Sequence, residues 1–168
     1  MKLIELTQGQ VAIIDDEDFE RLNKHKWFAM RNPKNEDFYA VRNIKKDGGG
    51  YKIILMHREI MNAPKGMMVD HIHHNTSDNR KSNLRICTSS QSVMNRRKYK
   101  RKCSSIYKGV WLNKRRDNKG LKHLQAGIAV NGKKIHLGFF YNEKDAARAY
   151  NKAALKYFGE FAELNIIQ

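Results

Sequence analysis

Apolar and polar residues alternate in several short stretches of the first half of the chain, a pattern typical of strands that bury one face. Residues 3–15 alternate in this way around a glycine turn, and 38–44 and 51–58 flank a glycine-rich segment, which predicts a hairpin. Acidic residues 15–18 favour the start of a helix directly after the first pair of strands. The N-terminal part is therefore predicted to be a small β-rich platform.

The middle of the chain predicts a strand, a loop, a strand and a helix, in that order. Apolar strands are expected at 67–72 and 83–88, and they enclose the polar loop 73–82. A helix is expected at 89–98, with Thr88 or Ser89 as its N-terminal cap.

The second half of the chain predicts a sheet with one helix. Strands are expected at 106–112, 123–130 and 133–140, and the last two are joined by Asn131-Gly132, the dipeptide best suited to a two-residue type I′ turn. An amphipathic helix follows, between an asparagine cap and a closing glycine. We therefore expect a three-stranded antiparallel sheet with one packed helix, and the fold class α+β for the whole chain.

The balance of charge points to a polyanionic partner. The 168 residues contain 33 Lys and Arg against 17 Asp and Glu, a net charge of +16. Residues 99–168 are the more cationic part, with 15 basic and 5 acidic side chains against 18 and 12 in residues 1–98. Six cations fall within 96–102, a run that predicts either a solvated hinge or a strap along nucleic-acid phosphates, and the two interpretations are compatible.

Several classes of protein are disfavoured by the sequence. The chain has no apolar stretch of about 18 residues, no signal-peptide core, no lipidation signal and no strongly amphipathic basic helix, so we expect a soluble, unexported protein without a membrane partner. Cys87 and Cys103 are its two cysteines. Two cysteines exclude a four-cysteine zinc ribbon, so a bound metal is expected to have oxygen and nitrogen ligands, in a reducing compartment.

The adjacent Asp70 and His71, at the end of a predicted strand, offer two tools for phosphodiester hydrolysis. A carboxylate can ligate a hard cation such as Mg²⁺, and a neutral imidazole can take a proton from water. Neighbours on a strand point to opposite faces, so both can serve one site if the strand end twists into the loop. By itself the dipeptide is a weak signal, which favours a structural pair over a catalytic one.

The setting of this pair changes its interpretation. Residues 69–97 resemble the HNH, or His-Me finger, nuclease motif of phage and intron-encoded homing endonucleases, in which two strands and a helix form a ββα-metal finger. The resemblance implies that His71 is the general base, that Asp70 is a metal ligand, and that Asn83 fixes the loop and orients the histidine. It also implies one divalent metal ion, Mg²⁺ or alternatively Mn²⁺, and no small-molecule cofactor.

The third motif position departs from the family, which has Asn or His there. Counting from Thr88 leads to Ser92, with Asn95 one helical turn further. Three alternatives follow: Ser92 ligates the metal weakly or through water, Asn95 takes the role because the two share a helix face, or the site is impaired.

Residues 107–165 resemble the plant ethylene-response-factor (APETALA-type) DNA-binding domain, through the motifs YKGV, LGFF and AARAY. Positions at which the plant domains read bases carry other residues here, among them Trp111, Ala129 and His136, so their sequence preference is not carried over. By position and charge, the residues expected to contact DNA are Arg58, Arg85, Arg96, Arg97, Lys100, Arg101, Trp111, Lys114, Arg115, Lys134 and His136.

These interpretations divide the chain into a platform (1–56), a nuclease finger (57–98), a basic linker (99–105) and an ethylene-response-factor-like domain (106–168). The expected function is a metal-dependent endonuclease that nicks double-stranded DNA as a monomer, either homing or free-standing, phage-encoded and acting in the cytoplasm of the host. The alternative is a catalytically impaired, sequence-specific DNA-binding protein or regulator, which the serine at position 92 favours. RNA binding is a weaker alternative, because no aromatic stacking platform is evident in the sequence.

Overall fold

The structure is a computed structural model of the chain, and it describes residues 1–33, 37–98, 103–116 and 122–167. Contacts within the chain define two compact units, Met1–Ser92 and Val93–Gln168. Each unit has its own buried apolar core. The finer four-part division of the chain stays a prediction.

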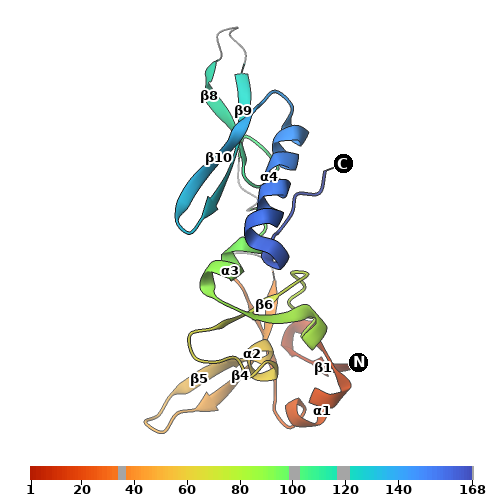
Figure 1. Cartoon of the computed structure of the whole chain (residues 1–168). Helices are drawn as coiled ribbons and strands as arrows, with labels where there is room; N and C mark the ends of the chain where they lie inside the picture. The colour runs from red at the N-terminus through yellow and green to blue at the C-terminus, as the bar shows by residue number, and fades with distance from the viewer. Residues whose placement is uncertain (34–36, 99–102, 117–121, 168) are drawn as a thin grey trace. The chain divides into compact units, whose positions relative to one another are not determined.

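The first unit consists of small antiparallel sheets and short helices (Figure 1). In chain order its elements are β1 (Lys2–Glu5), η1 (Thr7–Gly9), β2 (Val11–Ile14), α1 (Asp16–Leu22), β3 (Phe28–Arg31), β4 (Phe38–Lys45), β5 (Tyr51–Leu55), α2 (Met56–Ile60), β6 (Met68–His71), η2 (Lys81–Asn83), β7 (Leu84–Cys87) and α3 (Ser89–Met94), whose last residues lie in the second unit. β1 pairs with β2, β4 lies between β3 and β5, and β6 pairs with β7.

Apolar residues from several of these elements form the core of the first unit. Ile14, Leu22 and Met56 are fully buried, and Leu84 at the start of β7 packs into the same cluster. Trp27 belongs to the same cluster. Its indole N–H donates to the carbonyl of Leu22 at 2.8 Å, so the polar group of this buried side chain is satisfied. The core therefore ties β7 to the N-terminal hairpin.

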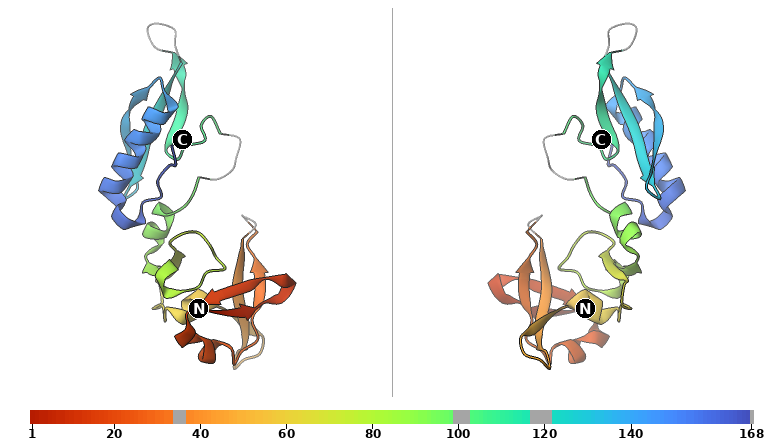
Figure 2. Two further views of the ribbon diagram at one scale, coloured as in Figure 1. Left: turned by 90° about the vertical axis from the view of Figure 1, so that its right-hand side faces the viewer. Right: turned by 90° about the vertical axis from the view of Figure 1, so that its left-hand side faces the viewer.

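The second unit is a three-stranded antiparallel sheet with a helix along one face (Figure 2). Its elements are β8 (Val110–Arg116), β9 (Lys122–Val130), β10 (Lys133–Phe140), α4 (Glu143–Phe158) and η3 (Gly159–Phe161), and β9 is the central strand. Four buried alanines on α4 allow the helix to approach the sheet closely, and the larger ring of Tyr150 fills the space between them. The side chain of Asn142 caps α4 by accepting from the backbone N–H of Lys144 at 2.8 Å.

The predicted α+β class is confirmed by these small antiparallel sheets and few helices. The predicted type I′ turn is also confirmed, since Asn131 and Gly132 have φ angles of 50° and 77°. None of the helices in the described ranges is long and apolar enough to cross a membrane.

Several element boundaries differ from the predictions, and one strand was not predicted. The strand expected at 106–112 begins at Val110, because Gly109 has a φ of 72° and its backbone packs against the ring of Tyr150. The strand expected to reach residue 58 ends at Leu55, where α2 begins. The helix expected to reach residue 98 ends at Met94, before a run of like charges. β3 was not predicted from the sequence.

Candidate active site

Asp70 and His71 lie at the end of β6, which β7 holds in register. Asp70 is opposite Arg85 and His71 is opposite Leu84. The Arg85 guanidinium donates from Nη2 to Asp70 Oδ2 at 3.0 Å, and both side chains are more than four-fifths buried. This ion pair fixes the direction of the Asp70 carboxylate.

A pocket of about 490 Å³ in the first unit brings the predicted residues together. Asp70, His71 and Ser92 all line it, although they come from β6 and α3. Asp70 and His71 reach the same pocket because the strand ends there and the chain turns into the loop, with the His74 N–H donating to the His71 carbonyl at 3.1 Å. The two side chains can therefore serve one site, although neighbours within a strand point to opposite faces.

Burial sets the protonation state of His71. The side chain is buried, which lowers the pKa of the imidazole because the charged form loses its hydration. The Asn79 side chain and the carboxylates of Asp70, Asp78 and Asp37 raise the pKa, but less than burial lowers it. The pKa of His71 thus lies below its ordinary value of 6.5, and the ring is neutral near pH 7.

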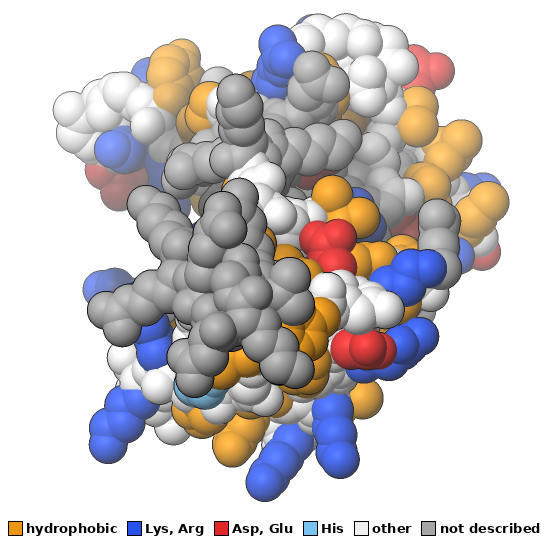
Figure 3. Space-filling model, turned by 90° about the horizontal axis from the view of Figure 1, so that it is seen from above, with side chains coloured by type: hydrophobic (Ala, Val, Ile, Leu, Met, Phe, Trp, Pro, Cys, Tyr) orange, Lys and Arg blue, Asp and Glu red, His pale blue; other side chains and the backbone are white. Residues whose placement is uncertain are grey.

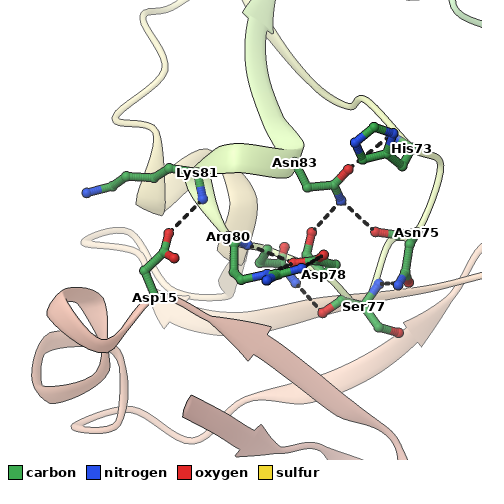
Figure 4. Close-up of polar contacts among 9 residues, drawn as sticks. Asp15, His73, Asn75, Ser77, Asp78, Arg80, Lys81 and Asn83 are labelled. Atoms are coloured by element: carbon green, nitrogen blue, oxygen red, sulfur yellow. Dashed lines mark hydrogen bonds and ion pairs between the residues drawn. The ribbon is translucent and has the colours of Figure 1, made fainter. Parts of the chain in front are cut away.

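Asn83 joins three backbone groups of the loop that follows His71 (Figure 4). Its side-chain oxygen accepts from the N–H of His73 at 3.0 Å. Its amide nitrogen donates to the carbonyls of Asp78 at 2.8 Å and Asn75 at 3.2 Å. Because Asn83 is buried, these bonds hold the middle of the loop, at Asn75 and Asp78, close to its beginning at His73, next to His71.

The far end of the loop is bound to the N-terminal hairpin. Ile13 and Asp78 form a parallel bridge, in which the Ile13 N–H donates to the Ser77 carbonyl and the Asn79 N–H donates to the Ile13 carbonyl, both at 2.8 Å. The Asp15 carboxylate accepts from the N–H of Lys81 at 2.8 Å (Figure 4). The β1–β2 hairpin and the residue that follows it therefore hold the far end of the loop in place.

Asp78 adds an ion pair to this support, and the pair predicts an acid-sensitive contribution to stability. The Arg80 guanidinium, bound to Asp78 through Nε at 2.8 Å and Nη2 at 2.6 Å, holds the pKa of the carboxyl below its ordinary value. A lowered folded-state pKa stabilises the fold above the unfolded-state pKa, and the gain is lost as pH falls through the folded-state value. Asp78→Asn is expected to lower the free energy of unfolding at pH 7, with a difference from wild type that shrinks toward pH 3 in denaturant titrations. A difference independent of pH would contradict this assignment.

The residues at the third motif position fall in different units. Ser92 lines the pocket, whereas Asn95 belongs to the second unit and is buried there. Of the two candidates, Ser92 shares the pocket with Asp70.

The donor atoms around the pocket fit a hard divalent ion. Asp70 presents a carboxylate and Ser92 a hydroxyl, and Mg²⁺ is typically held by one or two carboxylates while it keeps several waters and binds substrate phosphates. Within the described ranges no three His, Cys, Asp or Glu side chains are grouped as a metal site. A largely hydrated ion shared with a phosphate matches this sparse set of protein ligands.

The predicted DNA-contacting arginines of the first unit have partners within the protein. Arg58 donates from Nη1 to the carbonyl of Met67 at 2.5 Å, and from Nη2 to those of Ala63 and Pro64 at 3.4 Å. It thereby connects α2 to the segment just before β6. Arg85 binds Asp70, as described above. DNA contact by these two side chains stays a prediction.

The predicted DNA-contacting cations of the basic run 96–102 and of β8 are only partly described. Arg96 and Arg97 are exposed, and Arg97 Nε lies 3.6 Å from a carboxylate oxygen of Glu163. Lys100 and Arg101 lie outside the described residues, as do the side chains of Lys114 and Arg115. In the view of Figure 3, Lys and Arg side chains project at several separate points around the margin.

The sheet face that α4 leaves uncovered carries aromatic and polar side chains in the second unit. The Trp111 ring lies across Gly127, where an added Cβ would come within 2.7 Å of the indole. His136 accepts from or donates to Gln125 at 2.9 Å, and its ring lies 4.6 Å from the ring of Phe139. Lys134 is exposed two positions before His136 on the same strand, and positions two apart on a strand share a face.

Several pocket residues were missed or given no chemistry from the sequence, Asp37, Tyr39 and His57 among them. Tyr39 lies on β4, in the part that the sequence predicts only as a platform, and His57 lies on α2, at the start of the predicted nuclease finger. A periodic strand gives no signal that one of its aromatic residues faces a site. The one local signal available was a histidine in the first turn of a short helix, between Met56 and Arg58.

Comparison with known proteins agrees with this location of the site. Residues 62–94 match the family model of the HNH endonucleases, and this segment contains Asp70, His71, Asn83 and Ser92. A curated relative, the "Uncharacterized HNH endonuclease L560" of Acanthamoeba polyphaga mimivirus, is 29% identical over 160 residues, which cover 95% of this chain and 77% of the relative. No solved structure matches the chain. The candidate site thus lies within a segment that is similar to HNH endonucleases, and the relative that spans almost the whole chain carries the same family name.

Proposed function

We propose that this chain is a metal-dependent endonuclease that hydrolyses phosphodiester bonds and nicks double-stranded DNA as a monomer. The observation that carries the proposal is the shared pocket of His71 and Asp70, within the segment that matches HNH endonucleases. A neutral imidazole beside a carboxylate supplies a proton acceptor and a cation ligand, the two groups that this hydrolysis needs.

In the proposed reaction, His71 takes a proton from the attacking water. Its burial keeps the imidazole neutral beforehand, and the carboxylates of Asp70, Asp78 and Asp37 offset the positive charge that it then acquires. Asn83 acts through the loop, since it fixes the backbone that leads away from His71.

Asp70 and Ser92 are the residues that would hold the divalent ion. When bound, the ion supplies positive charge that stabilises the phosphate and the leaving oxygen. Arg85 binds Asp70 Oδ2 and so fixes the orientation of the carboxylate. The other carboxylate oxygen, Oδ1, would then be the ligand of the ion.

The direct test is conversion of supercoiled plasmid to relaxed circles. Conversion is expected with Mg²⁺ or Mn²⁺ and is expected to stop with EDTA. Conversion that persists in EDTA would overturn the metal dependence. DNA binding without conversion under any of these conditions would favour the alternative function, a catalytically impaired DNA-binding protein, which the hydroxyl at position 92 supports.

Ser92 gives a second, sharper prediction. Ser92→Asn places an amide oxygen, a better ligand than a hydroxyl, at the same position of α3. We expect the half-saturating Mg²⁺ concentration for nicking to fall several-fold, as measured by metal titration of the initial rate. Ser89→Asn, on the same helix but outside the pocket lining, is the control and should leave the metal titration unchanged. If Ser92→Asn has no effect, Ser92 is not the ligand position.

The second unit is proposed to bind the DNA duplex. Its three strands contain six Lys and Arg and no Asp or Glu, which suits a polyanion, and a narrow β-structure can enter the major groove. The residues proposed to face DNA are those of the uncovered face and the linker, Trp111, Lys134 and His136 among them. The resemblance to ethylene-response-factor domains supports this assignment by analogy.

Binding is expected to weaken steeply with salt. Each phosphate that the protein neutralises should contribute roughly 0.9 to the negative slope of log K against log salt. Fluorescence anisotropy with a labelled duplex measures this slope, and Lys134→Ala should reduce it by about one. A flat response of the wild type would contradict backbone binding.

A further inference from the structure

His57 is a buried histidine to which the proposed reaction assigns no role. It lies in the first turn of α2, is 6% exposed, and lines the same pocket as His71. Met56 and Ile60, on the same short helix, belong to the apolar core. A buried histidine between these apolar positions calls for an explanation, because polar side chains are seldom fully buried without a partner.

The rings of His57, His71 and Tyr39 form a cluster. The His57 and His71 centroids are 5.0 Å apart with an interplanar angle of 76°, an edge-to-face contact. The Tyr39 ring lies 5.7 Å from His57 and 6.2 Å from His71. The three rings come from α2, β6 and β4, so two elements distant in sequence place aromatic rings beside the His71 imidazole.

The contact limits the rotation of the His71 ring. The terminal torsion of a histidine side chain has a broad energy profile, so packing decides the direction of the two ring nitrogens. A nitrogen that must accept a proton from a bound water needs a fixed direction, since small displacements of a catalytic group strongly lower the rate.

The helix that carries His57 is held in place by the two residues that follow it. Arg58, the next residue, binds the carbonyl of Met67 directly before β6. Glu59 accepts from Arg42 Nε on β4 at 2.9 Å. α2 is thereby attached both to the strand of His71 and to the strand of Tyr39.

His57 also contributes no positive charge. Burial, with smaller effects from His71 and Arg58, lowers the pKa of His57 to about 3. A neutral ring does not repel the imidazolium that forms on His71, whereas a lysine at this position would.

We propose that His57 is a positioning residue: its ring packs against the His71 imidazole and holds it in the orientation that faces the pocket. This inference rests on the proposed function, and it adds a residue of α2 to the machinery. What matters is the ring of His57, not its nitrogen atoms.

Three variants test this role. His57→Ala removes the ring, His57→Gln keeps a polar group of similar reach without a ring, and His57→Phe keeps a ring without nitrogen. In single-turnover nicking at saturating protein, Ala and Gln are expected to lower the rate about 10- to 100-fold, and Phe is expected to recover most of it. The duplex dissociation constant should stay unchanged in all three. Recovery by Gln but not by Phe would overturn the proposal, as would a wild-type rate in His57→Ala or an equal loss in Ala and Phe.

A measurement without DNA or metal separates this proposal from the proposed function. In long-range ¹H–¹⁵N spectra of histidine-labelled protein, the His71 ring signals should shift or broaden in His57→Ala and Gln, and stay sharp in His57→Phe. Unchanged His71 signals in His57→Ala would overturn the positioning role. Absence of nicking by the wild type, with the expected ring signals, would instead refute the proposed function and leave the ring contact established.

Discussion

Replacement of His71 by alanine is expected to lower the rate of plasmid nicking by about 10²- to 10⁴-fold, the range that a general base contributes. The loss should appear in single-turnover experiments at saturating protein, because it concerns the chemical step. Duplex affinity should remain within about twofold of wild type, since His71 is buried in the pocket of the first unit. The variant therefore separates cleavage from binding.

His25→Ala is the matched control. His25 is an exposed histidine of the same unit and does not line the pocket. Its replacement should leave both cleavage and affinity unchanged. Equal nicking by wild type and His71→Ala would remove His71 from the catalytic role and leave the assignment of the pocket without its central residue.

Asn83→Ala is expected to cost about 2–4 kcal/mol of unfolding free energy in the first unit, because it leaves one N–H and two carbonyls of the loop without their partner in a buried position. The nicking rate should also fall, since the loop that follows His71 loses the side chain that fixes its backbone. Urea denaturation followed by circular dichroism measures the stability, and plasmid nicking measures the activity.

The same loop offers an internal control for this variant. Asn75 is exposed, and its side chain accepts from the Ser77 N–H at 3.2 Å. Asn75→Ala should cost under about 1 kcal/mol, since water can replace the lost bond. If both asparagines cost the same, burial of the Asn83 amide is not what stabilises the loop.

The local pattern of the chain was sufficient to predict much of the fold. Alternation and turn residues predicted the β4–β5 and β9–β10 hairpins, and the asparagine cap predicted the start of α4. These features depend on residues close in sequence. Boundaries were less accurate where tertiary packing decides, as at Gly109, whose positive φ is set by the ring of Tyr150.

The candidate site was predicted in part, for the same reason. The dipeptide Asp70-His71 and the position of Ser92 could be located from the motif, and they line one pocket. Tyr39 reaches that pocket from a strand some 30 residues earlier, and no local pattern encodes such a contact. The ion-pair partner of Arg85 could not be predicted either. Arg85 was selected for its charge, but its pairing with Asp70 follows from the β6–β7 register.

The bridge between Ile13 and Asp78 bears on how far this module can be transplanted. The recognisable segment is 62–94, yet the backbone groups of Ser77 and Asn79 find their partners on β2, more than 60 residues upstream. A graft of 62–94 alone into another protein would leave these groups unbonded. The smallest portable unit that carries the candidate site therefore includes the N-terminal hairpin, and it is larger than the segment that matches the HNH endonuclease model.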